Sequence, residues 1–211
     1  MIHDISPLLD PDVAVWPGDS PYEAKDLLRI EDGNSVHLST ISLSCHTGAH
    51  ADAPCHYVKG APGIDEADLA KYIGPATLVD VEPTDHAIRP DDLPHFEWSP
   101  RILLRTGAMR DRKVFPDPLT CLTVELIEHL AERGCVLIGL DSPSVDRFDS
   151  KDLPCHKALY EHGIVNLECL ALEGVPAGRY ELIALPLRLK GRDASPVRAI
   201  LREIGSENAP R

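Results

Sequence analysis

Three histidines and one aspartate fall within eleven residues of this chain. The run reads His46-Thr-Gly-Ala-His50-Ala-Asp52-Ala-Pro-Cys-His56, with the spacing H-x3-H-x-D-x3-H. Imidazole and carboxylate groups are the usual nitrogen and oxygen ligands of zinc. The small residues between them leave space for an ion, so the pattern favours a metal site over isolated structural or surface histidines. The spacing alone leaves open whether one or two ions bind.

The backbone around this cluster is predicted to be a loop. An i, i+4 pair such as His46 and His50 can share one face of a helix, but Gly48 lies between them and Pro54 follows soon after. Both residues argue against a long regular helix. We therefore expect a loop that leaves a strand and points the side chains inward, because functional residues commonly lie on loops held by a rigid scaffold.

The elements predicted around this loop are mostly strands. Residues 35–44 alternate apolar and polar side chains with one slip, which indicates a strand with a bulge directly before the cluster. Residues 8–21 are rich in proline and aspartate and are expected to form a loop. Further strands are predicted over residues 2–6, 76–81, 102–104, 135–140 and 180–185.

The clearest helix is predicted over residues 123–133. Thr123 can cap its first turn, an apolar stripe follows, and Gly134 ends it. Two shorter helices are predicted over residues 65–73 and 153–162. Strands outnumber helices and only some alternate with them, so we expect an α/β fold with a mixed sheet.

Composition indicates one globular domain over residues 1–211, because 43% of the residues are hydrophobic and no linker is evident. The net charge of −13 argues against binding to nucleic acid or to an anionic membrane surface. No apolar run approaches the roughly 20 residues that span a bilayer, and no secretory signal is recognised at the start. The six cysteines form no CxxC pair and are expected to be reduced thiols in a cytoplasm.

The His46–His56 run resembles the signature HTGTHxDxPxH of the cyclase-like metal-dependent hydrolases, and the resemblance extends over nearly the whole chain. Other segments resemble one branch of that superfamily, the bacterial kynurenine formamidases. These segments are Trp16-Pro-Gly-Asp19, Gly139-Leu-Asp-Ser-Pro-Ser-Val-Asp146, Ser150-Lys151 leading to His156, and Asp193-Ala-Ser-Pro-Val-Arg198.

This resemblance implies a compact β/β/α domain that assembles as a homodimer. It implies hydrolysis of N-formyl-L-kynurenine to L-kynurenine and formate, in tryptophan breakdown, at a site with two zinc ions. His46, His50 and Asp52 would hold one ion. Asp52 and His156 would hold the other, and Glu168 would contact both. Taken alone, Glu168 reads as the solvated end of a strand.

The resemblance also implies that His56 is the acid/base residue and that Trp16 lines the substrate pocket. Histidine titrates near neutral pH, so His56 can take a proton from the attacking water and pass it to the leaving aniline nitrogen. A divalent ion can lower the pKa of water to about 7 and polarise the amide carbonyl. From the residues alone, His56 as a third ligand and Trp16 as a core residue stay open.

The residues also allow alternative supporting bonds, metals and functions. Ala49 stands where the signature has its second Thr, which can remove a hydrogen bond that supports the ligands. Manganese and cobalt also suit histidine and carboxylate ligands. The same cluster would serve a related hydrolase of isatin-type cyclic amides, or a metal-binding protein without turnover, although a purely structural site does not need an additional histidine.

Overall fold

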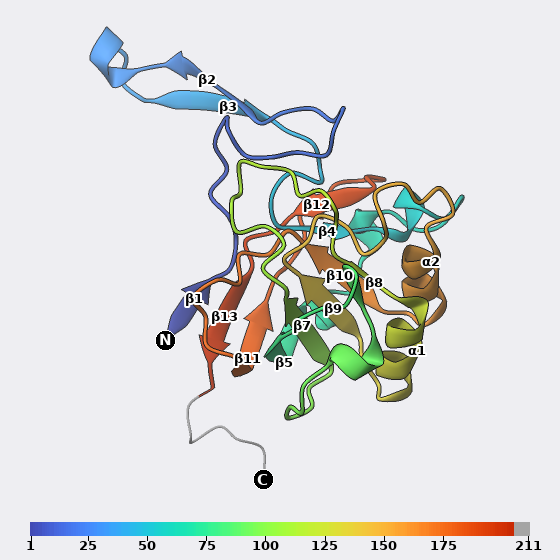
Figure 1. Cartoon of the computed structure of the whole chain (residues 1–211). Coiled ribbons are helices and arrows are strands. Elements are labelled where there is room, and N and C mark those ends of the chain that lie inside the picture. Colours follow the sequence, from blue (N-terminus) through green and yellow to red (C-terminus); the bar gives the residue numbers. More distant parts are fainter. Residues whose placement is uncertain (205–211) are drawn as a thin grey trace.

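A nine-stranded mixed sheet forms the centre of the computed structural model, which describes residues 1–204 (Figure 1). The single domain predicted over residues 1–211 therefore includes seven residues, 205–211, outside the described part. The strands lie in the order β1-β13-β11-β5-β7-β9-β10-β4-β12. Their bounds in that order are Ile2–Asp4, Ile200–Glu203, Gly178–Ile183, Ile73–Asp80, Arg101–Arg105, Leu137–Leu140, Val165–Glu168, His50–Asp52 and Ala194–Pro196.

The sheet is parallel at its centre and antiparallel at both sides. Strands β5, β7, β9 and β10 pair in parallel, and the remaining neighbours pair antiparallel. This arrangement confirms the predicted α/β fold with a mixed sheet. The strands predicted at residues 2–6, 76–81, 102–104, 135–140 and 180–185 are all present, with slightly different ends.

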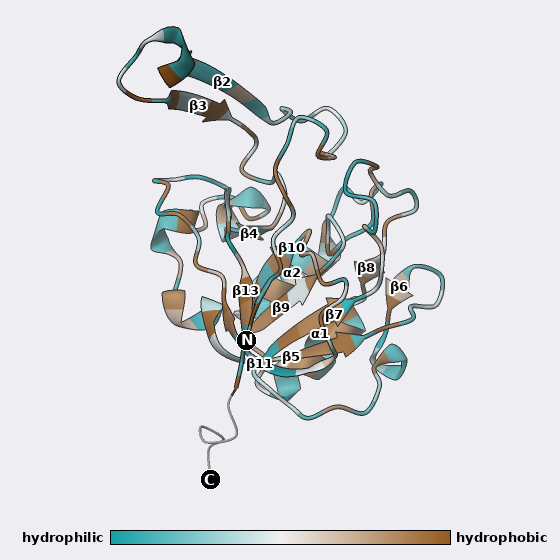
Figure 2. Ribbon diagram, turned by 90° about the vertical axis from the view of Figure 1, so that its left-hand side faces the viewer, coloured by the Kyte–Doolittle hydropathy of each residue, from teal (hydrophilic) through white to brown (hydrophobic). Residues whose placement is uncertain are grey.

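Both faces of the sheet are covered by apolar side chains. Along β7, Ile102 and Leu104 belong to one buried cluster and Leu103 to another, as the two-residue period of a strand requires. The first cluster packs beneath the helices α1 (Val124–Glu132) and α2 (Pro154–Glu161). Figure 2 shows the apolar strands gathered in the centre of the body.

Helix α1 begins where the sequence predicts. The Thr123 side chain accepts a hydrogen bond from the backbone N–H of Leu126 at 3.2 Å, which caps the first turn. Gly134 follows the helix with a φ of 80°, the left-handed conformation that glycine favours at a helix end. The helix predicted over residues 153–162 is α2, so both of these predictions are confirmed.

The helix predicted over residues 65–73 is wrong. Two short 3-10 helices, η3 (Ile64–Glu66) and η4 (Leu69–Tyr72), take its place. Ala67 between them is extended, with φ −59° and ψ 136°, and this interrupts the helical backbone. Asp68 then starts η4, because its side chain accepts from the backbone N–H of Ala70 at 3.1 Å.

A second, two-stranded sheet extends away from the body (Figure 1). It pairs β2 (Glu23–Leu28) with β3 (Leu38–Ser42), and every residue of both strands is exposed. The strand predicted over residues 35–44 is thus shorter and solvent-exposed. Its predicted bulge falls on the partner strand instead, where the register shifts between Asp26 and Leu28. We call β2, β3 and the turn between them the hairpin arm.

Smaller elements complete the described chain, and residues 8–21 form a loop, as predicted. Within residues 1–204, no helix is long and apolar enough to cross a membrane. The smaller elements are β6 (Ala87–Ile88), which pairs in parallel with β8 (Cys121–Leu122), and the 3-10 helices η1 (Ile30–Asp32), η2 (Pro54–His56) and η5 (Pro90–Asp92).

Candidate metal centre and active site

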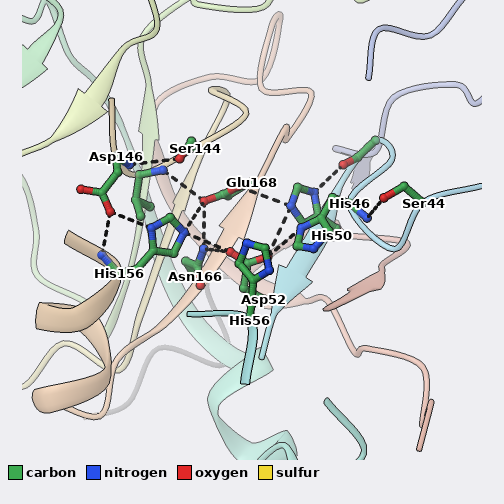
Figure 3. Close-up of polar contacts among 12 residues, drawn as sticks. Ser44, His46, His50, Asp52, His56, Ser144, Asp146, His156, Asn166 and Glu168 are labelled. Atoms are coloured by element: carbon green, nitrogen blue, oxygen red, sulfur yellow. Dashed lines mark hydrogen bonds and ion pairs between the residues drawn. The ribbon is translucent and has the colours of Figure 1, made fainter. Parts of the chain in front are cut away.

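The His46–His56 run lies beside the end of β10, because β4 pairs with that strand. Glu168, the last residue of β10, stands opposite His50 in the antiparallel register. The predicted loop is therefore only part of the cluster: His50 and Asp52 lie on a buried strand. Figure 3 shows these side chains converging with His156, which comes from α2.

Two groups of possible metal ligands form here and share one carboxylate. His46, His50 and Asp52 form the first group, and Asp52, His156 and Glu168 form the second. In each group the ligand atoms lie within 4.8 Å of one another. All five residues that the sequence predicts as metal ligands are thus brought together.

The two carboxylates direct separate oxygens to the two groups. Asp52 Oδ1 lies 3.1 Å from His46 Nδ1 and 3.5 Å from His50 Nε2, whereas Oδ2 lies 3.4 Å from His156 Nε2. Glu168 Oε2 lies 3.3 Å from His50 Nε2, and Oε1 lies 3.7 Å from His156 Nε2. This is the arrangement by which a carboxylate contacts two cations at once.

The polar atoms in this centre fit a bound cation. His50 Nε2 and Asp52 Oδ1 are buried and have no hydrogen-bond partner within residues 1–204. A buried polar atom without a partner is costly, and a coordinated ion would satisfy both atoms. The donor set of histidine nitrogens and carboxylate oxygens is the one that zinc and related ions prefer.

The electrostatics of the centre also favour positive charge. Burial alone would lower the pKa of His156, but its hydrogen bonds to Asp146 and Asp52 raise it to about 10. Burial opposes charge on Asp52 as well, yet its close contacts with His156 and His46 hold the pKa of this carboxyl well below its usual range. The centre thus keeps its carboxylate charged and stabilises a neighbouring cation.

Each buried histidine is oriented by a contact on its other ring nitrogen. His50 Nδ1 lies 2.8 Å from the carbonyl oxygen of Gly48, and His156 Nδ1 lies 2.7 Å from Asp146 Oδ2. Such contacts fix the ring and leave Nε2 free to bind an ion. Asp146 also accepts from the backbone N–H groups of Cys155 and His156, both at 3.0 Å, and so fixes the start of α2.

Asn166 lies behind the two carboxylates and was not predicted. Its Nδ2 donates to Asp52 Oδ2 at 2.8 Å and to Glu168 Oε1 at 3.0 Å, and the side chain is buried. The backbone N–H of Val145 donates to the same Glu168 oxygen at 3.1 Å. The sequence signal was weak, because one Asn two residues before a Glu on a strand is ordinary.

His56 lies at the edge of the centre on η2. Its ring centroid is 4.4 Å from that of His46, and 35% of its side chain is exposed, so it faces both the centre and solvent. Burial lowers the pKa of His56, in contrast to its neighbours. Asp193 Oδ2 lies 3.7 Å from His56 Nδ1 and 3.0 Å from His46 Nε2. These three residues form a further possible ligand group, so His56 as a ligand stays open.

A cavity of about 260 Å³ opens onto this centre and has two unlike walls. The polar wall carries the histidines and carboxylates of the centre. The other wall is apolar, and Trp16 lies on it. Trp16 stacks on Phe148, with 5.0 Å between the ring centroids, and meets the edge of Phe115 at 5.3 Å. The apolar wall is formed by Ala14, Val15, Trp16, Met109, Phe115, Pro143 and Leu153.

Known proteins resemble this chain in sequence and in fold. It is 44% identical to a kynurenine formamidase of Salinibacter ruber over 205 residues. This match covers 95% of this chain and 96% of that protein. It is 41% identical to a kynurenine formamidase of Bacillus cytotoxicus, over 95% and 97% of the two chains.

Solved structures of metal-dependent hydrolases also resemble this chain in fold. A potential metal-dependent hydrolase with cyclase activity superposes with a TM-score of 0.81 at 28% identity, over 97% of this chain and 99% of that one. Isatin hydrolase A from Labrenzia aggregata superposes with a TM-score of 0.76 at 25% identity, over 95% and 93%. The family model described as putative cyclase matches residues 3–147. With its centre of histidines and carboxylates on a curled mixed sheet, the chain belongs to the cyclase family of metal-dependent hydrolases.

Proposed function

We propose that this protein hydrolyses N-formyl-L-kynurenine to L-kynurenine and formate, as an arylformamidase with two zinc ions per subunit. One observation carries the proposal: Asp52 and Glu168 each direct separate oxygens to two histidine groups, beside a cavity whose apolar wall includes Trp16 and Phe115. A hydrolytic centre next to an apolar surface suits an amide attached to an aryl group. The names of the relatives at 41–44% identity support the same reaction.

In this proposal one ion is held by His46, His50 and Asp52, and the other by Asp52, His156 and Glu168. Asp52 and Glu168 would hold both ions and would offset part of their charge. The unpaired buried atoms of His50 and Asp52 support these roles. Two bound divalent ions supply Lewis acidity, which polarises the formyl carbonyl and makes water a better nucleophile.

The side chains around the ions bind the substrate and transfer the proton. The apolar wall with Trp16 binds the aryl ring of the substrate and excludes water from it. His56 takes a proton from the attacking water and gives it to the aniline nitrogen, because its partly exposed ring lies against the centre. The C–N bond of the formamide then breaks, and formate and the free aniline leave.

We further propose that residues 1–211 form one functional domain that works as a homodimer in the cytoplasm. The hairpin arm supports the dimer, since it exposes large apolar side chains that a second copy can cover. The six free cysteines support a reducing compartment.

The decisive test is hydrolysis of N-formyl-L-kynurenine by purified protein before and after chelation, followed by addition of zinc, manganese or cobalt. We expect turnover that chelation abolishes and zinc restores. Isatin is the control substrate, because the fold is also similar to that of isatin hydrolase A. Folded, zinc-loaded protein that opens isatin but leaves the formamide intact would establish the cyclic-amide reaction instead.

A further inference from the structure

A single tight turn carries two of the residues that line the cavity, Trp16 and Asp19. The backbone N–H of Asp19 donates to the carbonyl oxygen of Trp16 at 2.9 Å, which closes the turn. Pro17 suits its second position, and Gly18, at φ 93°, supplies the left-handed conformation required at the third. The turn therefore presents an indole ring and a carboxylate side by side at the cavity.

The indole end of this turn is held by rings from two other loops. Phe148 stacks on Trp16 at 24° between the ring planes, and Phe115 meets it edge-on at 82°. Phe148 remains 52% exposed, so this contact is formed at the surface rather than in the core. Because the ring of Trp16 is fixed at one end of a four-residue turn, the position of Asp19 relative to the apolar wall is also fixed.

The carboxylate end of the turn has no cationic partner within residues 1–204. Asp19 Oδ1 accepts from the backbone N–H of Ser20 at 2.8 Å, and no ion pair of the described chain includes this side chain. The other carboxylates that line the cavity, Asp52 and Glu168, both face histidines. Asp19 is thus the one cavity carboxylate that the described residues leave available to a ligand.

We propose that Asp19 binds the α-ammonium group of the substrate while Trp16 holds its aryl ring. This inference rests on the proposed function and makes its substrate class more specific: a 2-formamidophenyl ketone that carries an α-amino acid. In such a molecule a short chain of atoms joins the aryl ring to the ammonium group. The turn likewise separates Trp16 from Asp19 by only two residues, so the two side chains can contact the two ends of one substrate. A carboxylate and an ammonium group form a charge-assisted hydrogen bond, which neutral analogues cannot replace.

The test compares wild type with Asp19→Asn on three substrates: N-formyl-L-kynurenine, its analogue without the amino group, and formanilide. The variant keeps the shape of the side chain and removes its charge. We expect kcat/KM for N-formyl-L-kynurenine to fall by about 10- to 100-fold, mainly through KM, since a hydrogen bond to a charged group is lost. The values for the two substrates without an ammonium group should stay within about twofold of the wild type.

Asp12→Asn is the matched control, because Asp12 lies on the same loop and pairs with Lys113 at the exposed surface. It should change none of the three values. An equal loss on all three substrates in Asp19→Asn would overturn the inference, since it would assign Asp19 to holding the turn. No loss on any substrate would overturn it too. Wild-type protein that is inactive on every formamide would instead refute the proposed function.

Discussion

The separate oxygens of Asp52 and Glu168 determine what the centre can hold. Each oxygen of these two carboxylates faces its own histidine group, so each side chain can contact two cations without sharing an oxygen. The close spacing in the chain predicts His46, His50 and Asp52, and the family resemblance adds His156 and Glu168. The sequence does not predict Asn166, Asp146 or Asp193, since residues that support a ligand are recognisable only once the fold brings them near it.

Replacing His56 tests the proton transfer. We expect His56→Gln to keep its full content of bound metal while kcat for N-formyl-L-kynurenine falls by about 10²- to 10⁴-fold, the usual contribution of a general acid or base. Metal analysis and steady-state kinetics on the same preparation measure both quantities. His86→Gln, at an exposed position far along the chain, is the control. Joint loss of metal and activity would instead make His56 a ligand.

Replacing Asn166 tests the support of the two carboxylates. Asn166→Leu removes both hydrogen bonds and should weaken metal binding by about 10- to 100-fold, as is typical for residues that orient ligands. Competition with a chromogenic chelator measures the affinity without requiring turnover. Thr77→Val is the matched control, because it also removes a buried hydrogen bond but lies on β5 away from the centre. Equal metal affinity in both variants would contradict this role.

Helices and strands could be predicted where the residues that determine them are close together in the sequence. Helix α1 has its cap, apolar stripe and terminal glycine within one stretch of sequence, and the structure has it there. The residues of η3 and η4 have helix-forming types, but the extended backbone at Ala67 separates them into short turns. The edge strand β12, and β13 between β1 and β11, were not predicted, because they pair with β4 and β1 from remote parts of the chain. Strand β2 was not predicted because its own apolar pattern is weak.

Thr123 allows a test at this scale. Thr123→Ala removes the acceptor for the first turn of α1 and should lower the free energy of unfolding by about 1 kcal/mol. Thr123→Ser keeps the hydroxyl and should restore most of that loss. Chemical denaturation of metal-loaded protein measures both variants. If Ser and Ala destabilise equally, the methyl group and not the cap would account for the effect.

At the scale of the whole molecule, the hairpin arm has strands that residues 1–204 leave exposed along their full length. Leu38 and Ile41 are 48% and 57% exposed there, and Ile30 at the turn is 59% exposed. An isolated two-stranded hairpin is only marginally stable in water, so a partner surface is expected to stabilise the hairpin arm. The alternating pattern of residues 35–44 predicted a strand, and in the proposed homodimer a second copy would cover its apolar side chains.

Charged substitutions on this arm test the proposed homodimer. The double variant Leu38→Glu and Ile41→Glu should shift the protein from dimer to monomer, because two charges cannot be buried in an apolar interface without partners. Sedimentation velocity over a range of concentrations measures the assembly. Leu69→Glu, which places a charge at an exposed leucine of the body, should leave the dimer intact. A double variant with unchanged mass would exclude the arm from the interface.

The metal centre is assembled from residues that are far apart in the chain, so it can form only late in protein synthesis. Asp52 and the Asn166 that supports it are 114 residues apart, and His46 and Asp193 are 147 residues apart. At about 5–20 residues per second, the ribosome needs roughly 7–30 s to add the second stretch. Until β10 and then β12 have been synthesised, β4 lacks the two strands with which it pairs. Complete metal loading is therefore a step that follows translation of nearly the whole chain.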